Sequence, residues 1–293
     1  MPLIPYTEAS EELLTLFNSE KESVLARYYE PEPGLFIAES AKVTLRAVQA
    51  GYRLTAMLIE DAQLNREAQE LLSRFPDVPA YHAPSKEYLK ISGYPMTRGV
   101  LALFRRKESC RPEPLHTIPG SSCSGISKHG SDAERDSDAS SASRRRTAVL
   151  VEVGNPANIG SIFRNAAALG ISSIMLSKGC CDPLSRRCLR VSMGCVFQVP
   201  WMMTGLPGEK IAGMLRTQGF QTAAMALSDD SVSILDPSLK SARNLAIFLG
   251  NEGNGLPEET IQACDVVVRI PMREGVDSLN VAAASAIAFW ELR

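Results

Sequence analysis

The sequence has no segment that would direct it to a membrane or out of the cell. Residues 1–10 contain neither the basic run nor the apolar run of a signal peptide. No uninterrupted apolar stretch reaches the roughly 20 residues that a membrane-spanning helix needs. We therefore expect a cytoplasmic protein with no membrane partner.

Metal-binding cysteine patterns and a strong net charge are also missing. The seven cysteines show no paired CxxC spacing, so reduced thiols are expected and a zinc site is not. The formal net charge is -2, so a nucleic-acid site must depend on local basic clusters. Two clusters qualify, 144–146 and the group Arg186, Arg187 and Arg190. For both, contact with phosphates and a solvated charged face are the alternatives.

The chain of 293 residues is long enough for two domains. Residues 1–106 alternate apolar runs with stretches of helical spacing, which predicts an α/β domain. Residues 107–146 are rich in Ser, Gly and Pro and nearly lack large apolar side chains, which predicts a disordered linker. Residues 147–293 restart the α/β pattern. The expected strands are 34–39, 54–59, 78–82, 99–104, 147–153, 173–176, 245–249 and 266–270; the expected helices are 42–50, 65–75, 85–92, 159–169, 210–218 and 278–292.

Three strand-to-loop junctions in the second domain combine Gly, Pro and Asn with a charged residue. Ligands of open α/β sheets bind at the carboxyl ends of strands, so these junctions are the candidate sites. The first, 154–160 (GNPANIG), leads into a helix and carries Asn158, followed by Arg164. A ligand role and a helix-capping Asn with a surface Arg are the alternatives there.

The other two junctions lie near the end of the chain. Residues 249–257 (LGNEGNGLP) contain three glycines that would let the backbone approach a ligand, with Glu252 among them. Residues 270–280 (IPMREGVDSLN) lead into an Ala-rich helix, with Ser278 expected as its cap and Asn280 in its first turn. Residues 249–257 are not a P-loop, because they lack GxxxxGK(S/T). At the first junction, Gly154 and Gly160 do not form GxGxxG, which argues against the rival assignment, a dinucleotide oxidoreductase.

Together, the segments NPANIGSIFRNAAALG (155–170), FLGNEGNGLP (248–257) and IPMREGVDSLNVAAASA (270–286) resemble the SpoU (TrmH) family of SPOUT methyltransferases. RVSMGCVFQVP (190–200) resembles the family's middle segment, and Asp277 departs slightly from its pattern. More loosely, FIAES (36–40) and SGYPMTRGVLAL (92–103) resemble the family's ribosomal-protein-like substrate-binding domain.

The resemblance implies a fold and a reaction. The catalytic domain, 147–293, would be an α/β SPOUT domain with a deep C-terminal trefoil knot, acting as a homodimer. It would transfer a methyl group from S-adenosylmethionine to an RNA ribose 2'-hydroxyl, with ribosomal RNA favoured over transfer RNA. Three alternatives stay open: a transfer RNA substrate, methylation of a base, and a catalytically silent RNA-binding relative.

The resemblance also implies roles for individual residues. The catalytic residues would be Arg164, Asn158, Ser278, Asn280 and Glu252. The cofactor would be held by Leu249, Gly250, Asn251, Glu252, Ile270, Met272, Ser278, Leu279 and Asn280. The family's arginine has been regarded as a general base, but a guanidinium, which stays protonated at neutral pH, suits phosphate binding and alkoxide stabilisation better. Asn158 and Ser278 would orient Arg164 and the nucleotide, and Glu252 would brace the cofactor loop.

Overall fold

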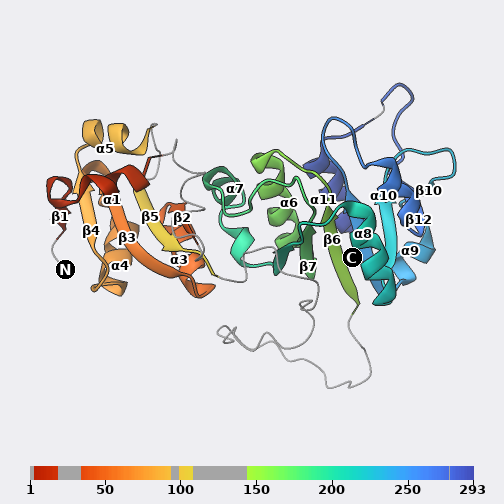
Figure 1. Cartoon of the computed structure of the whole chain (residues 1–293), viewed down its shortest axis with the longest axis horizontal. Helices are drawn as coiled ribbons and strands as arrows, with labels where there is room; N and C mark the ends of the chain where they lie inside the picture. Colours follow the sequence, from red (N-terminus) through yellow and green to blue (C-terminus); the bar gives the residue numbers. More distant parts are fainter. Residues whose placement is uncertain (1–2, 19–33, 94–98, 108–143, 277) are drawn as a thin grey trace, which may run out of the picture. The chain divides into compact units, whose positions relative to one another are not determined.

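The computed structural model describes residues 3–18, 34–93, 99–107, 144–276 and 278–293 (Figure 1). These residues form two compact units. The first unit contains the described residues up to 107 together with 154–164 and 181–198. The second contains 144–153, 165–180 and 199–293, of which 277 is not described. Two segments of the predicted catalytic domain therefore pack with the N-terminal part of the chain. The predicted linker lies largely outside the described residues.

The first unit is built on a five-stranded mixed sheet of order β1-β4-β3-β5-β2. Strands β3 and β4 are parallel, whereas β5 is antiparallel to both β3 and β2. Helices α1 and α5 cover one face, where Leu16 and Tyr88 pack on Leu58 and Leu103. The elements are β1 (Ile4–Pro5), η1 (Tyr6–Glu8), α1 (Glu11–Leu16), β2 (Leu35–Glu39), α3 (Ala41–Gln49), β3 (Arg53–Glu60), η3 (Asp61–Gln63), α4 (Arg66–Arg74), β4 (Ala80–Ala83), α5 (Ser85–Ser92) and β5 (Val100–Arg105), joined by α7 (Arg186–Val191) and η5 (Cys195–Phe197).

The second unit is built on a seven-stranded, all-parallel sheet of order β10-β12-β9-β11-β6-β7-β8. Helix α8 covers one face of this sheet (Figure 1). There Ile211 and Leu215 pack on Val149 and Phe248. Helix α6 begins in the first unit and ends in the second. The elements are β6 (Arg145–Leu150), α6 (Pro156–Leu169), β7 (Ser173–Leu176), β8 (Trp201–Met203), α8 (Gly208–Thr217), β9 (Gln221–Met225), β10 (Val232–Ser233), α9 (Pro237–Ser241), β11 (Asn244–Leu249), α10 (Glu258–Ala263), β12 (Val266–Arg269) and α11 (Val281–Leu292).

Most predicted strands and helices are confirmed within a few residues, but the start of the last helix is not where the sequence suggested. Ser278 does not cap it. Asn280 is the capping residue, because its Oδ1 accepts a hydrogen bond from the Ala282 amide at 2.9 Å. The cap moves the helix start to Val281 and leaves Ser278 in the preceding loop. Asp277 lies outside the described residues.

In the basic run at 144–146, Arg144 and Arg145 are exposed, as expected for a solvated face, but Arg146 is not. Strand β6 begins at Arg145, inside the predicted linker. Arg146 is buried, and its guanidinium donates to the main-chain oxygens of Leu292, Ala242 and Lys240. Arg146 thus belongs neither to a phosphate site nor to a solvated face, because it holds the carbonyl ends of α9 and α11.

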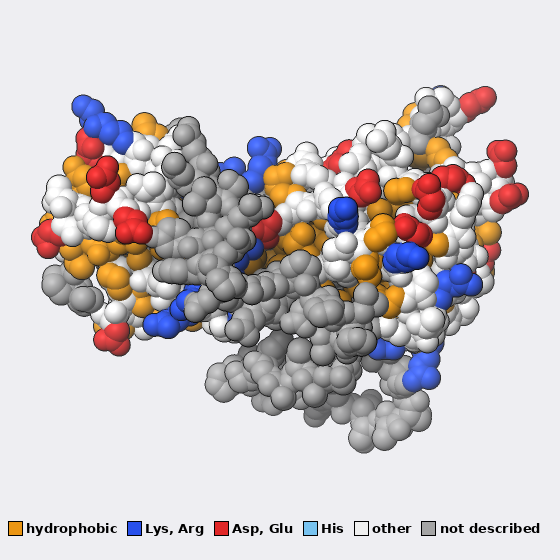
Figure 2. Space-filling view, viewed as in Figure 1, with side chains coloured by type: hydrophobic (Ala, Val, Ile, Leu, Met, Phe, Trp, Pro, Cys, Tyr) orange, Lys and Arg blue, Asp and Glu red, His pale blue; other side chains and the backbone are white. Residues whose placement is uncertain are grey.

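On the visible face, Lys and Arg side chains are interspersed with Asp and Glu (Figure 2). The described cysteines carry thiols and form no disulfide. No helix among the described residues has the length and apolar character needed to span a membrane.

Candidate active site

A pocket of about 330 Å³ lies in the second unit, at the carboxyl ends of the adjacent strands β9, β11 and β12. This is the edge of a parallel sheet at which α/β proteins bind ligands. Two loops complete the walls, the one after β11 and the one between β12 and α11. The lining residues are Met225, Ala226, Leu227, Leu249, Gly250, Asn251, Glu252, Gly253, Asn254, Gly255, Leu256, Ile261, Val268, Arg269, Ile270, Met272, Ser278, Leu279, Val281 and Ala284.

The loop after β11 is a tight hairpin closed by its own backbone. Asn251 and Gly255 exchange two main-chain hydrogen bonds, of 2.9 and 3.0 Å. Gly255 has a φ of +68°, in the left-handed region that favours glycine. A Cβ at Gly250 would lie 2.3 Å from the carbonyl carbon of Gly255, so only glycine fits there. The glycines predicted from the sequence therefore make the hairpin compact and bring its peptide groups to the pocket.

The second wall combines apolar and polar groups. Ile270, Met272 and Leu279 supply apolar surface, and Ser278 supplies a hydroxyl. Eight predicted cofactor-binding residues line the pocket; these are Leu249, Gly250, Asn251, Glu252, Ile270, Met272, Ser278 and Leu279. Asn280 is not among the lining residues, since its side chain caps α11.

The predicted catalytic residues Asn158 and Arg164 lie on α6, in the part that belongs to the first unit. Asn158 lies in the first turn of α6 and is buried, whereas Arg164 is exposed. The capping side chain is that of Asn155, whose Oδ1 accepts from the Ala157 amide at 2.9 Å. The alternative of a capping Asn at 158 is therefore wrong. At Gly160 a Cβ would lie 2.7 Å from the Cys188 main-chain oxygen, so α6 and α7 approach closely there.

Of the three arginines of α7, only Arg186 departs from the phosphate-binding or solvated face considered from the sequence. Arg186 is buried, and its Nε donates to Glu39 Oε1 at 3.0 Å. Arg190 reaches the other oxygen of Glu39 at 3.4 Å but is itself exposed, as is Arg187, so these two lie on a solvated face. An acidic residue at the end of an apolar run is a weak signal, so sequence reasoning missed Glu39.

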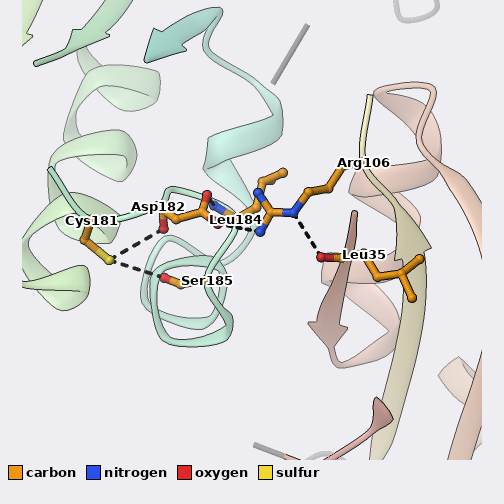
Figure 3. Close-up of polar contacts among 6 residues, drawn as sticks. All are labelled: Leu35, Arg106, Cys181, Asp182, Leu184 and Ser185. Carbon is orange, nitrogen blue, oxygen red and sulfur yellow. Dashed lines mark hydrogen bonds and ion pairs between the residues drawn. The ribbon is translucent and has the colours of Figure 1, made fainter. Parts of the chain in front are cut away.

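A second ion pair ties the same segment to the N-terminal sheet (Figure 3). Arg106 donates from Nε to the Leu35 main-chain oxygen at 2.9 Å and pairs with Asp182. Asp182 in turn accepts from the Leu184 amide at 2.9 Å, which fixes the turn before α7. The residues 181–198 are therefore held by buried and half-buried charges as part of the first unit.

Comparison with known proteins supports the family that the pocket segments resemble. Residues 145–290 match the model of the SpoU rRNA Methylase family. An uncharacterized tRNA/rRNA methyltransferase of Mycobacterium tuberculosis is 33% identical over 88% of this chain and 80% of that protein. The chain belongs to the SpoU methylase family. The prediction of a SpoU-family RNA methyltransferase is thereby confirmed.

Two further proteins, one compared by structure and one by sequence, are also similar to this chain. The AdoMet-bound rRNA methyltransferase from Sinorhizobium meliloti has a TM-score of 0.71 with 24% identity, covering 99% of this chain and 96% of that one. This confirms a mixed α/β fold of the SpoU type. The 23S rRNA (guanosine-2'-O-)-methyltransferase of Vibrio vulnificus is 32% identical over 49% of this chain and 56% of its own length.

Proposed function

We propose that this protein methylates a ribose 2'-hydroxyl of RNA, with S-adenosylmethionine as the methyl donor and ribosomal RNA as the substrate. The observation that carries the proposal is the pocket, because two of the three family motifs converge on it in a chain of the SpoU family. The Vibrio vulnificus relative, whose name gives 23S rRNA and a guanosine 2'-oxygen as its target, supports the choice of ribose and of ribosomal RNA.

The pocket suits S-adenosylmethionine in size and chemistry. Its volume falls at the lower end of the range of small-molecule sites, about 300–1,000 Å³. The hairpin residues from Gly250 to Gly255 line the pocket, and Leu249, Ile270 and Leu279 offer apolar surface to a nucleoside. When bound, the cofactor supplies an electrophilic methyl group on a sulfonium. The residues of this chain would orient it for in-line attack.

Arg164 is proposed to bind an RNA phosphate and to stabilise the alkoxide that develops on the ribose. A guanidinium stays charged at neutral pH, so it donates hydrogen bonds but is a poor proton acceptor. Asn158 and Ser278 are proposed to orient Arg164 and the target nucleotide. Glu252 would brace the hairpin. Asn280 would act indirectly, since it fixes the start of α11, which lines the pocket through Val281 and Ala284.

The remaining expectations concern organisation. We propose that the N-terminal domain selects the RNA, that the catalytic domain contains the family's trefoil knot, and that it forms a homodimer. The exposed apolar side chains of Ile287 and Trp290 on α11 favour a contact through that helix. Trp290→Glu is then expected to shift a dimer toward monomer in sedimentation velocity. The cytoplasmic location stays a prediction.

The decisive experiment incubates the protein with methyl-labelled S-adenosylmethionine and either ribosomal RNA transcripts or transfer RNA, followed by nucleoside analysis. A labelled 2'-O-methyl nucleoside from ribosomal RNA supports the proposal. The same product from transfer RNA alone would overturn the substrate, and a base-methylated nucleoside would overturn the ribose. No label in any RNA, with folded protein, would favour a silent RNA-binding relative.

A further inference from the structure

The main-chain pairing of β6 with β11 ends beside the pocket and is continued there by a side chain. The last rung joins the Val151 amide to the Leu249 oxygen at 2.9 Å. The next residue on the β6 side, Glu152, turns out of the strand with a φ of +54°. Its main-chain oxygen accepts a hydrogen bond from Asn251 Nδ2 at 2.9 Å. The Asn251 amide thus replaces the next rung of the ladder.

The other end of the Asn251 side chain holds the hairpin itself. Its Oδ1 accepts from the Gly253 amide at 2.7 Å and from the Asn254 amide at 3.4 Å. Both polar atoms of the Asn251 side chain are therefore engaged by the protein, one in the hairpin and one on Glu152. The Asn251 side chain therefore has a structural role in the hairpin that is separate from contact with a ligand.

Glu152 is held in its unusual backbone conformation from the opposite side. A left-handed φ is unfavourable for a residue with a Cβ and persists only where the surroundings impose it. The Glu152 amide donates to Ser177 Oγ at 3.0 Å, and that hydroxyl donates to the Lys178 main-chain oxygen at 3.0 Å. Ser177 is buried and its own amide bonds to the Leu150 oxygen at 2.9 Å. The main-chain N–H and C=O of one residue, Glu152, thereby connect the ends of β7, β6 and β11.

We propose that Ser177 and the main chain of Glu152 position the pocket hairpin, residues 250–255, through Asn251. Asn251 is then a positioning residue of the cofactor pocket. The strand ends at Leu150 and Leu249 are buried, whereas the hairpin is exposed at Glu252, Gly253 and Asn254. We call the hydrogen bonds that run from Ser177 through the main chain of Glu152 to the Asn251 side chain the anchor; without it, the hairpin would lose its side-chain connection to the end of β6. The functional part of this inference rests on the proposed use of the pocket for S-adenosylmethionine.

Two variants remove the anchor in different ways. Asn251→Asp keeps the acceptor that holds Gly253 but sets a carboxylate oxygen against the Glu152 carbonyl. Ser177→Ala removes the acceptor of the Glu152 amide without adding charge. Matched controls lie at the opposite ends of the same strands. Asn244→Asp also loses a donor to a main-chain oxygen, that of Gly219, and Ser173→Ala loses a hydroxyl contact with Thr147.

The cofactor readout is the Kd of S-adenosylmethionine by titration calorimetry, together with the melting temperature of each variant. One lost hydrogen bond corresponds to a rise in Kd of about fivefold. We expect this rise in Kd for Asn251→Asp and for Ser177→Ala. Each of these variants should have a melting temperature like that of its control, and the controls should bind S-adenosylmethionine as tightly as the wild type. The double variant should bind S-adenosylmethionine only as weakly as the weaker of the two single variants, because both changes interrupt the same series of hydrogen bonds through the main chain of Glu152. Anchor variants that bind as tightly as their controls would overturn the proposal.

A second readout does not depend on the cofactor. Hydrogen exchange of the ligand-free protein should accelerate across 250–255 in both anchor variants and stay unchanged there in both controls. Unchanged exchange in the anchor variants would overturn the anchor itself. Wild-type protein that fails to bind S-adenosylmethionine while its variants show the accelerated exchange would overturn the proposed function and leave the anchor supported.

Discussion

Glu39 and Arg186 form an ion pair of 3.0 Å although 147 positions separate them in the chain, and their side chains are only 5% and 4% exposed. Arg186 also donates to the Phe17 main-chain oxygen at 3.1 Å. Strand β2 ends at Glu39 and helix α7 begins at Arg186, so the pair joins the N-terminal sheet to a segment of the second half of the chain. Charges buried this deeply are tolerated only when paired and hydrogen-bonded.

Glu39→Ala should destabilise the first unit strongly. It leaves the Arg186 charge buried without its carboxylate, a change that costs about 3–5 kcal/mol. Urea unfolding followed by circular dichroism measures the loss. The control is Glu70→Ala, which removes the exposed partner of Arg74 and should cost about 0.5 kcal/mol. Equal effects of the two substitutions would contradict a structural role for the buried pair.

The pocket loops could be predicted from the sequence because the residues that mark them are neighbours in the chain. Gly250 and Gly255 follow an apolar strand, and a glycine-rich turn at a strand end indicates a ligand site whatever the rest of the fold. The burial of Arg186 could not be predicted in this way. Three arginines within 186–191 suggest a solvated or phosphate-binding face, and only the distant Glu39 makes one of them a buried residue.

Strand order limited the prediction of the pocket itself. Met225 and Arg269 line it because β9, β11 and β12 are neighbours in the sheet. That order is not the order of the strands in the chain, so spacing alone could not bring Met225 to the loop at 250–255. Arg146 is a similar case, since the carbonyl groups that accept its hydrogen bonds belong to helices that lie about 95 and 145 residues further along the chain.

Gly250→Ala should impair the cofactor pocket. The added Cβ would lie 2.3 Å from the Gly255 carbonyl carbon, so the hairpin must shift. Displacements of about 1 Å at a site can reduce activity by about 100-fold. We expect a loss of that order in kcat/KM for methyl transfer. Gly213→Ala on α8 is the control; nothing lies within 4 Å of its Cβ, and it should stabilise the helix by up to about 1 kcal/mol.

Arg146→Met should loosen the C-terminal helix. Burial lowers the pKa of Arg146, but a guanidinium remains charged at neutral pH, and its donors satisfy the Leu292 and Ala242 oxygens. Their loss should cost about 3 kcal/mol. Hydrogen exchange should rise near the end of α11. The control is Arg145→Met at the neighbouring exposed arginine, which should lower the free energy of unfolding by under about 1 kcal/mol. A similar loss for both variants would argue against a structural role for the hydrogen bonds from Arg146 to the main-chain oxygens.

The Cys264 thiol should react slowly in the folded protein. Burial raises the pKa of Cys264 to about 12 from an ordinary 9.0. Alkylation by iodoacetamide at pH 8, followed by peptide mass mapping, should be about 30-fold slower than in urea, because less thiolate is present. The unfolded thiol ionises first as pH rises, so stability falls between pH 9 and about 12. Cys264→Ala should make that fall shallower, whereas an unchanged slope would contradict the raised pKa.

Arg164→Ala separates a general base from an electrostatic group. Arg164 is exposed on α6, so the substitution should leave the melting temperature unchanged. If Arg164 binds phosphate and stabilises the alkoxide, kcat should fall by about 100-fold to 1,000-fold. The shape of the pH–rate profile should then be unchanged, because no titrating base has been removed. Loss of one limb of the profile would instead support the base role. Arg243→Ala, which removes another exposed arginine, should keep the wild-type rate and shows that the effect is not one of net charge.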